Sequence, residues 1–475
     1  MIQHIARIIL QFKECFKREK TWEWFLILIL GFMLRFGNVN RGITQVISTL
    51  RLKPAHYHTM LNYFRSTAYN VPALYSKWIE VAQQETEFLK VEERIVLLGD
   101  HIKIPKEGRR MPGIQIIHQE SQNSGKGEYI EGHIHAQVAA LVSGSGTTRS
   151  IPLMTERQQS PPKKADSKKP DGDTLVTQMV NLVTKCAGSL EEGSKAVAAL
   201  DAYYAKASAF LAADKAVNSE GERILEIVTR GRDDSTAYYK PGPRKKGQPG
   251  RTRKYGKKVV LWNLFSDKSK FSETTLCLYG KPTEVKFRCM DLIWRPLGHE
   301  RLVRFVLVES KLGRMILMCS DLTLKPEDII VTFGYRFKIE TSFDEQKNNN
   351  GCFSYHFWTK ALPKRKRWEK NNHMPQTDSP ELVDAANRAI DSFLCLGTIS
   401  TGILTIIAFS HNREIWKRYP GWIRTLRSKI PTIAVVKETL AQIFHIYLQL
   451  NPHAYPFCIV NERQRLVDFL YDDAV

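Results

Sequence analysis

The acidic residue most suited to chemistry in this sequence is Glu340, because two cations share its side of a predicted helix. The segment YRFKIETSFDEQK, residues 335–347, has the pattern of a helix. At about 100° per residue, Arg336 lies roughly 40° and Lys347 about 20° to one side of Glu340. Phe333 lies about 20° to the other side, so the four residues share one stripe. A carboxylate held between cations is suited to binding a metal ion and a phosphate group.

The same charges also occur on ordinary solvent-exposed helices, where opposite charges four residues apart stabilise the helix modestly. Ile339 and Phe343, however, lie beside the stripe and not opposite it. The charges are therefore predicted to border a buried face, which favours a binding site over a solvated surface.

Two aspartates end apolar segments that have the pattern of buried strands. Asp100 ends RIVLLGD, residues 94–100, and Asp201 follows the apolar run in KAVAALDAYY, residues 195–204. A lone carboxylate is costly to bury unless it is paired or binds a metal ion. Together with Glu340 these residues offer three carboxylates to one site, and such oxygen ligands favour Mg²⁺, or Mn²⁺ as a substitute, over Zn²⁺. We expect two such ions per site, the arrangement that catalyses phosphodiester displacement.

The ordered set of motifs resembles that of insertion-sequence DDE transposases of the branch whose glutamate helix carries the signature Tyr-x2-Arg-x3-Glu-x6-Lys. Here Phe333 stands at the tyrosine position, and Arg336, Glu340 and Lys347 follow at the signature spacing. The stretches LLGDHIKIPKEGRRMPG and VAALDAYYAK are similar to the family's first and second aspartate segments. The resemblance covers roughly residues 20–450. Its departure is Phe333, which lacks the hydroxyl of the signature tyrosine.

The resemblance implies a DNA transposase with a ribonuclease H-like core and Asp100, Asp201 and Glu340 as its metal-binding catalytic triad. Such an enzyme is an endonuclease that cuts the transposon end and joins the released 3′ hydroxyl to the opposite strand or to target DNA. Arg336 and Lys347 would contact phosphates at the cleaved end. The implied partners are double-stranded DNA with terminal inverted repeats, target DNA, and a second copy of the chain in a synaptic homodimer.

Two other functions fit the same residues. One is a catalytically silent DNA-binding relic or inhibitor of transposition, which would hold transposon ends without cutting them. The other is a ribonuclease H-like nuclease without strand transfer, which would cut DNA but never join ends.

The charge of the chain also indicates a polyanionic partner. Its 475 residues carry 70 Lys and Arg against 49 Asp and Glu, a net charge of +21. Nucleic acid is the first candidate for the partner, and an anionic membrane surface is the second. The eight cysteines include no C-x-x-C pair, which is typical of reduced thiols in a cytosolic protein. We expect a cytoplasmic, nucleoid-associated prokaryotic protein.

One segment has the length of a membrane span. Residues 392–410 are uncharged and apolar, but their Ser, Thr and Gly content and their place between charged helices favour a buried core helix. The earlier apolar run from Trp24 to Leu34 is shorter than the roughly 20 residues that a span needs. We therefore expect no membrane partner.

The predicted fold class is α/β, a ribonuclease H-like mixed sheet with a β-rich insertion domain and helical regions at both ends. Residues 1–90 are predicted to be helical and to bind the transposon end. Alternating strands and helices place the first part of the core in 91–232. The insertion domain with a basic arm occupies 233–325, the core helix that bears Glu340 lies in 326–375, and a helical region that is a candidate for dimerisation occupies 376–475.

Several segments are candidates for DNA contact. Residues 41–50 and 54–65 have the pattern of a helix-turn-helix that would present His56, His58, Asn62 and Arg65 to a groove, although two ordinary packed helices fit equally well. Residues 240–258 carry nine Lys and Arg and no acid, so they form a solvated loop or a basic DNA-binding arm. The residues that we expect to contact DNA in this arm and after the first aspartate are Arg251, Arg253, Lys254, Lys103, Lys106, Arg109 and Arg110.

Aromatic and histidine residues give weaker signals. Trp262 and Trp294 are candidates for stacking on a base, with core packing as the alternative. His133 and His135 alternate on a predicted strand and so face one side, as a pair of metal ligands does. Because no third ligand follows at a recognisable spacing, the surface of a strand is the favoured interpretation.

Overall fold

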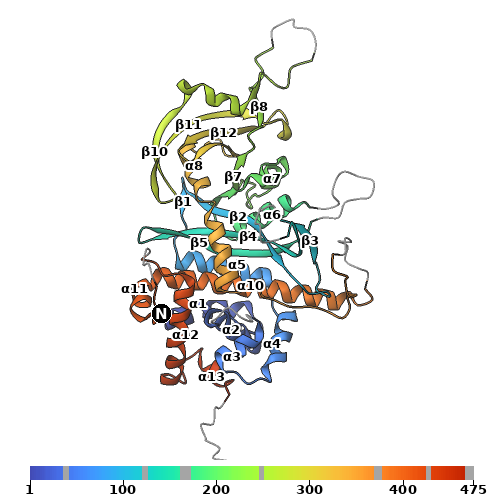
Figure 1. Ribbon diagram of the computed structural model, residues 1–475, viewed down its shortest axis with the longest axis vertical. Coiled ribbons are helices and arrows are strands. Elements are labelled where there is room, and N and C mark those ends of the chain that lie inside the picture. Colours follow the sequence, from blue (N-terminus) through green and yellow to red (C-terminus); the bar gives the residue numbers. More distant parts are fainter. Residues whose placement is uncertain are drawn as a thin grey trace, which may run out of the picture.

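The computed structural model describes residues 1–35, 42–119, 127–160, 173–244, 251–368, 377–423 and 429–465. The molecule is elongated, with a block of strands at one end, a layer of helices at the other and the sheet that carries Asp100 between them (Figure 1). The predicted α/β class is confirmed, with helices at both ends of the chain and a mixed sheet at the centre.

The described residues contain thirteen strands, all joined in one mixed sheet. Their order is β3-β4-β2-β6-β7-β13-β12-β11-β8-β9, with β1 beside β2, β5 beside β4 and β10 beside β11. The strands are β1 (Lys90–Val91), β2 (Arg94–Pro105), β3 (Gln115–His118), β4 (Tyr129–Gly144), β5 (Thr147–Gln158), β6 (Lys195–Leu200), β7 (Leu225–Gly231), β8 (Thr236–Tyr238), β9 (Lys258–Val260), β10 (Ser272–Leu278), β11 (Lys281–Ile293), β12 (Leu302–Ser310) and β13 (Gly313–Cys319).

The half of the sheet that carries the two aspartates changes direction at β2. Strands β2, β4 and β5 are antiparallel neighbours, whereas β6 and β7 run parallel to β2. A parallel strand with both faces covered must be apolar throughout, and β6 has the sequence KAVAAL with five consecutive buried residues. In the parallel pair, β6 ends beside the middle of β2, because Leu200 is opposite Gly99 and β2 continues to Pro105. The prediction that this strand ends at Asp100 is therefore wrong, since the strand keeps pairing with β4 beyond it.

The predicted insertion domain is continuous with this sheet, because β13 pairs antiparallel with β7. Strands β10 to β13 form an antiparallel meander, as their alternating apolar residues predict. The predicted boundary between residues 232 and 233 therefore lies within one hydrogen-bonded sheet. Residues 261–266 leave the sheet and form a short 3₁₀ helix.

The helices of the two chain ends pack together as one layer (Figure 1). The central helix of this layer is α10, which contacts β5 on one side and α2, α4, α5 and α12 on the others. The helices are α1 (Ile2–Leu10), α2 (Glu19–Leu34), α3 (Ile43–Leu50), α4 (His56–Arg65), α5 (Val71–Glu85), α6 (Leu175–Gly188), α7 (Ala207–Ala213), α8 (Pro326–Gly334), α9 (Lys338–Asp344), α10 (Pro380–Ser410), α11 (Asn412–Arg418), α12 (Ile433–Leu450) and α13 (Cys458–Asn461).

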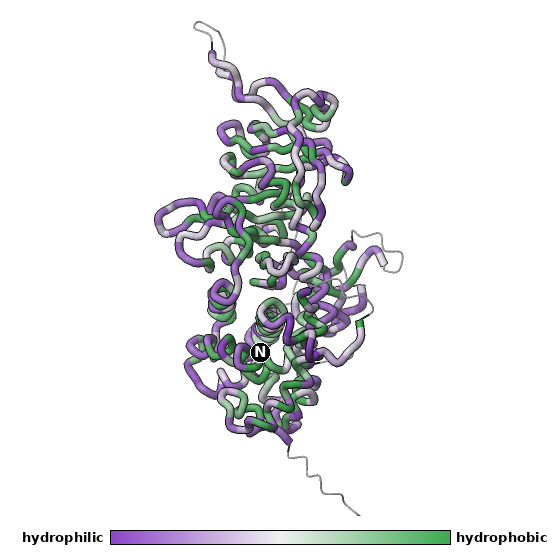
Figure 2. The backbone as a smooth tube through the Cα atoms, turned by 90° about the vertical axis from the view of Figure 1, so that its left-hand side faces the viewer, coloured by the Kyte–Doolittle hydropathy of each residue, from purple (hydrophilic) through white to green (hydrophobic). Residues whose placement is uncertain are grey.

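The apolar segment at 392–410 is a core helix, as predicted. In the part of the chain that the structure describes, α10 is the one helix long and apolar enough to cross a membrane, and 94% of its most apolar window is buried inside the protein. Figure 2 shows the apolar segments inside the helical layer and the sheet, with hydrophilic segments on the outer loops.

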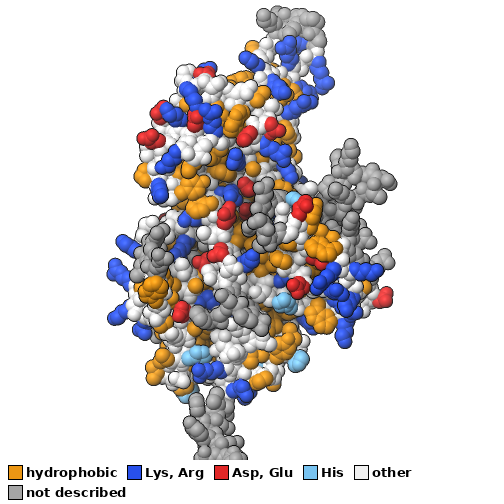
Figure 3. Space-filling model, viewed as in Figure 1, with side chains coloured by type: hydrophobic (Ala, Val, Ile, Leu, Met, Phe, Trp, Pro, Cys, Tyr) orange, Lys and Arg blue, Asp and Glu red, His pale blue; other side chains and the backbone are white. Residues whose placement is uncertain are grey.

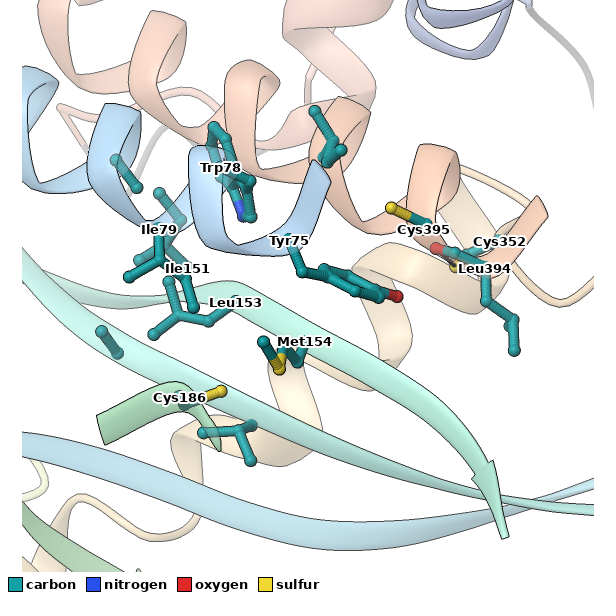
Figure 4. Close-up of a cluster of buried hydrophobic side chains, with 14 of the residues drawn as sticks. Tyr75, Trp78, Ile79, Ile151, Leu153, Met154, Cys186, Cys352, Leu394 and Cys395 are labelled. Carbon is teal, nitrogen blue, oxygen red and sulfur yellow. Dashed lines mark hydrogen bonds between the residues drawn. The ribbon is translucent and has the colours of Figure 1, made fainter. Parts of the chain in front are cut away.

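The contact between α5, β5 and α10 shows how closely the layers pack (Figure 4). Tyr75 and Trp78 of α5 lie over β5, and the indole of Trp78 donates to the carbonyl of Pro152 at 2.9 Å. The phenol of Tyr75 donates to the carbonyl of Thr155 at 2.7 Å. On the α10 side, a Cβ at Gly402 would lie 1.9 Å from the ring of Trp78, so only glycine fits there.

Candidate active site

Asp100 and Asp201 lie side by side at neighbouring strands. In the parallel pair of β2 and β6, Gly99 is opposite Leu200, so the two aspartates occupy the next position on each strand. Strands in a sheet are about 4.8 Å apart, which brings their backbones together. Asp201 then begins a short 3₁₀ helix, where its Oδ1 accepts from the backbone N–H of Ala202 at 2.7 Å. The sequence therefore identified two acids that the fold places together.

The side chain of Asp100 points toward the helix that carries Glu340. Residues alternate between the faces of a strand, so Asp100 shares a face with Val96 and Leu98. Those two residues belong to the apolar cluster that includes Ile339 and Phe343 of α9. The helix therefore packs on the same face of the sheet from which the aspartate projects.

Arg336 connects the strand acid to the helix acid. Its Nη1 lies 3.2 Å from Oδ2 of Asp100, and its Nη2 lies 3.0 Å from Oε1 of Glu340. The guanidinium and Asp100 are largely buried, with side chains 18% and 23% exposed, whereas that of Glu340 is 65% exposed. Two of the three predicted acids thus contact one guanidinium. The sequence predicted that Arg336 lies beside Glu340, and the structure adds its contact with Asp100.

Negative charge is concentrated around Asp100. Burial raises its pKa from 3.8 to about 6, opposed by the N–H of His101 and by Arg336, and the carboxylates of Asp201 and Glu340 raise it further. Asp201 and Glu340 are therefore near enough to Asp100 to repel its charge. A bound cation would relieve this repulsion, and an all-oxygen donor set suits Mg²⁺.

The metal site itself stays a prediction. Within the described ranges, no group of three or more His, Cys, Asp or Glu side chains is arranged to hold a metal ion. The nearest cation to Asp100 and Glu340 in the hydrogen-bond network is the guanidinium of Arg336. The carboxylates fit a divalent ion by their chemistry, while the arginine supplies the positive charge in the structure described here.

The predicted continuous helix over residues 335–347 is wrong. Helix α8 ends at Gly334, residues 335–337 form a turn, α9 covers Lys338–Asp344, and a π turn follows at Glu345–Asn349. The turn is tightened by bonds between residues three apart, including Glu340 N–H to the carbonyl of Phe337 at 3.1 Å. The two helices pack on different strands. Helix α8 contacts β6, β7, β10, β12 and β13, whereas α9 contacts β2 and β5.

Because the helix is interrupted at residues 335–337 and becomes a π turn at Glu345, Lys347 does not continue the straight stripe that the sequence predicted. Lys347 is exposed on the π turn, where it lines a pocket of about 1020 Å³ together with Lys106 and Tyr57. A π turn closes its hydrogen bond over five residues, here from Asn350 N–H to the carbonyl of Glu345 at 2.8 Å, so side chains no longer follow 100° steps. The contact of Lys347 with phosphate remains a prediction.

The altered signature position has a packing role. Phe333 is half-buried against the apolar cluster of α8, α9 and the sheet. Burial raises the pKa of the neighbouring Tyr335, whose hydroxyl interacts with Thr148 of β5. Tyr335 therefore does not replace the hydroxyl that Phe333 lacks.

The basic residues after Asp100 divide into anchored and exposed ones. The ammonium of Lys103 donates to the carbonyl of His118 at 2.9 Å. Lys106 is 8% exposed and donates to the carbonyl of Tyr355 at 3.1 Å, so it is not a contact for a DNA backbone and its expected role is wrong. Arg109 is exposed and Arg110 is half-buried. Their backbone carbonyls accept from the backbone N–H groups of Arg365 and Thr359, which lie between the π turn and α10.

The predicted basic arm is partly described. Arg251, Arg253 and Lys254 are all exposed, and Figure 3 shows Lys and Arg side chains gathered at this end of the molecule, beside β8. Residues 245–250 of the arm lie outside the described residues. The exposure of the three cations leaves both the solvated loop and the DNA contact open.

Packing is the role that the structure supports for the two tryptophans. Trp294 is half-buried with its ring centroid 5.6 Å from that of Phe210, and Trp262 lies 5.2 Å from Phe265. Sequence reasoning instead missed Tyr279, which is 50% exposed in the hairpin between β10 and β11. Its ring lies 4.9 Å from that of Phe337, the residue after Arg336. A Tyr-Gly pair between two predicted strands was the available signal for an exposed aromatic turn.

His133 and His135 lie in the core, so the prediction of a strand surface is wrong. Both imidazoles are fully buried, and both bond the hydroxyl of Tyr355, at 2.6 and 2.8 Å. Burial holds the pKa of both histidines well below 6.5. They form a buried polar network with Tyr355.

Replacing Tyr355 with Phe is expected to destabilise the protein by about 1–3 kcal/mol, because two buried imidazoles each lose a hydrogen bond. Because the histidines stay neutral when folded but gain protons below pH 6.5 when unfolded, stability should also fall as the pH drops through 6.5. Thermal unfolding at pH 8 and pH 5.5 measures both effects. Tyr203→Phe, at a position 41% exposed, is the control and should leave the midpoint unchanged.

The predicted helix-turn-helix segment forms two helices, but Pro54 does not open the second one. Helix α4 begins at His56, two residues later. His58, Asn62 and Arg65 are exposed along α4. His56 instead packs its ring 5.2 Å from Trp24. The exposed face of α4 is accessible to a DNA groove, and its binding to DNA stays a prediction.

No protein-family model matches the chain, and no curated protein matches its sequence. The functional inference therefore depends on the geometry of Asp100, Asp201, Arg336 and Glu340.

Proposed function

We propose that this protein is a DDE transposase that cuts and joins DNA ends. The observation that carries the proposal is that Arg336 contacts both Asp100 and Glu340, while Asp201 occupies the register position beside Asp100. Arg336 and Glu340 follow Asp201 by 135 and 139 positions and follow Asp100 by 236 and 240 positions. The order of the motifs in the transposase signature agrees with their proximity.

The order of the strands supports a ribonuclease H-like core. The strands lie in the order β5-β4-β2-β6-β7. The antiparallel strands β2, β4 and β5 follow one another in the sequence on one side of β2, and β6 and β7 run parallel to β2 on its other side. Helix α6 precedes β6 and α7 precedes β7. A core of this type carries its first acid on the central strand and its second after the adjacent parallel strand, which are the places of Asp100 and Asp201.

In this proposal Asp100, Asp201 and Glu340 would hold two Mg²⁺ ions. Ions bound in this way supply activation of the attacking oxygen and stabilisation of the leaving oxygen in phosphodiester displacement. Arg336 orients the carboxylates of Asp100 and Glu340 and offers its guanidinium to a phosphate.

The net charge of +21 supports a DNA partner, and a synaptic homodimer in the bacterial nucleoid is part of the proposal. The arm provides a test. Replacing Arg251, Arg253 and Lys254 together with Gln is expected to weaken DNA binding and to flatten the plot of log K against log salt by up to about 3, or about 0.9 for each lost phosphate contact. Fluorescence anisotropy across a salt series measures the slope.

The control for this experiment removes the same charge elsewhere. Lys195, Lys215 and Lys417 are exposed on other elements, so their triple replacement with Gln lowers the net charge equally. This variant should keep the wild-type slope. An arm variant with the wild-type slope would mean that the arm is only solvated.

The proposal as a whole is tested with duplexes that carry the terminal inverted repeats flanking the gene. With Mg²⁺, purified protein should nick these ends to leave a 3′ hydroxyl and then join that end to a target plasmid. Binding without nicking would identify a silent DNA-binding protein, and nicking without joining would identify a nuclease.

A further inference from the structure

Two nearly fully buried cationic side chains contact the backbone at the end of the π turn that follows α9. Arg35 follows α2 and is 2% exposed, and Lys437 lies on α12 and is 3% exposed. They come from opposite ends of the sequence. Both reach residues 349–351, at the end of the π turn that links them to α9 and Glu340.

Arg35 binds the carbonyl end of the π turn. Its Nη2 donates to the carbonyl of Asn350 at 2.6 Å and to that of Gly351 at 3.1 Å. Its guanidinium also lies 4.0 Å from the ring centroid of Phe32. Carbonyl groups at the end of a helical segment carry partial negative charge, so a cation there is favourable.

Lys437 uses three N–H bonds at the same place. Its Nζ donates to the carbonyl of Asn349 at 3.0 Å, to Oδ1 of Asn350 at 2.9 Å and to the carbonyl of Phe32 at 3.1 Å. An ammonium has three donors, and these contacts satisfy all of them. The lysine thus ties α12 and the end of α2 to the π turn.

Asn350 completes the arrangement toward α10. Its Nδ2 lies 2.8 Å from the hydroxyl oxygens of both Ser400 and Thr401 and 3.2 Å from the carbonyl of Gly397. Asn350 itself is fully buried. Helices from both chain ends therefore converge on one residue of the acid-bearing segment.

Such a cluster is suited to fixing position more than to adding stability. Burying a cation costs several kcal/mol unless it is well hydrogen-bonded, and an apolar core of the same volume is often as stable. The bonds to residues 349–351 are directional, so they fix where the π turn ends. Because α9 and the π turn are contiguous, the position of Glu340 along the sheet is fixed with them.

We infer that Arg35, Lys437 and Asn350 form a clamp that positions α9, and with it Glu340 and Arg336, against Asp100. They are positioning residues, and the helical regions at both chain ends become parts of the site. The identification of this site as a catalytic centre rests on the proposed function. The clamp itself rests only on the contacts of Arg35, Lys437 and Asn350.

The experiment reads the clamp through hydrogen exchange of the backbone N–H groups of α9, followed by NMR or mass spectrometry. The clamp bonds hold the end of the π turn that follows α9, so the wild type should exchange these groups slowly. In Lys437→Met, Arg35→Met or Asn350→Ala protein, exchange in α9 should become about tenfold faster or more, while exchange in β12 should stay within about twofold of the wild type.

Two controls separate positioning from general destabilisation. Thr439→Val removes a buried hydroxyl from the same part of α12, and Lys417→Met makes the same chemical change on the surface. Both should keep the slow exchange of α9. Lys437→Arg, which keeps the cation, should restore most of the slow exchange if Lys437→Met fails to fold.

Exchange of α9 that is as slow in the three clamp variants as in the wild type would overturn the inference. The exchange measurement needs neither DNA nor metal. A protein that never nicks DNA but exchanges α9 faster in the clamp variants would therefore disprove the proposed function and keep the clamp.

Discussion

Replacing Asp201 with Asn is expected to reduce Mg²⁺-dependent nicking of end DNA by about 10³-fold or more, which corresponds to about 4 kcal/mol of transition-state stabilisation. The amide keeps the size of the side chain and its oxygen can still accept from the N–H of Ala202. It removes the negative charge that a divalent ion requires. Single-turnover nicking of a labelled duplex measures the loss.

DNA affinity should stay within about twofold of the wild type in this variant, because phosphate contacts and not the metal carboxylates dominate affinity. Asp384→Asn, on the exposed side of α10, is the matched control and should nick normally. Nicking at the wild-type rate by Asp201→Asn would contradict the two-metal mechanism. A loss of binding together with nicking would indicate damage to the fold instead.

Asp100→Asn is expected to make the protein more stable at pH 8 while it abolishes nicking. The folded protein holds the pKa of Asp100 at about 6 against 3.8 for the ordinary carboxyl group, mainly through burial. Stabilisation by the protonated form is therefore present below pH 3.8 and lost as the pH rises through 6. The full difference corresponds to about 3 kcal/mol at pH 8.

An amide avoids the cost of burying the charge but gives up the ion pair with Arg336, so we expect a net gain of about 1–2 kcal/mol. Urea unfolding at pH 8 measures the gain, and the same comparison near pH 4 should show almost none. Asp384→Asn again serves as the control, with no gain at either pH. A variant that is less stable than the wild type at pH 8 would show that the ion pair outweighs burial.

The gain in stability of Asp100→Asn would also be informative about the function of Asp100. Carboxylates crowded beside one another are kept at a cost in stability when they serve chemistry. A stabilising substitution that removes activity at the same position would separate the two roles of this residue. A structural ion pair alone would instead show lost stability with no change in nicking.

The sequence by itself determined the elements that depend on local pattern. Continuous apolar runs predicted β6 and the first half of β2, and the acids that follow these runs were visible because charge is rare there. The second half of β2, from His101 to Pro105, was missed because its residues are not continuously apolar. The composition of residues 392–410 was sufficient to predict a core helix, since length, small polar residues and flanking charges are all local properties. The predicted proximity of Arg336 and Glu340 was also confirmed, because residues four apart lie about 40° apart around an α-helix and their side chains meet at 3.0 Å.

Only the tertiary structure decided the features that depend on distant partners. The helix is interrupted at residues 335–337, where α8 and α9 pack on different strands. The residues of the helix itself do not indicate which strands these are. His133 and His135 alternate as surface residues do, yet Tyr355, more than two hundred positions away, makes them core residues. The junction of Arg35, Lys437 and Asn350 likewise has no local pattern. Hydrogen bonds between remote segments form only when the whole chain has packed, so their geometry cannot be read from neighbours in sequence.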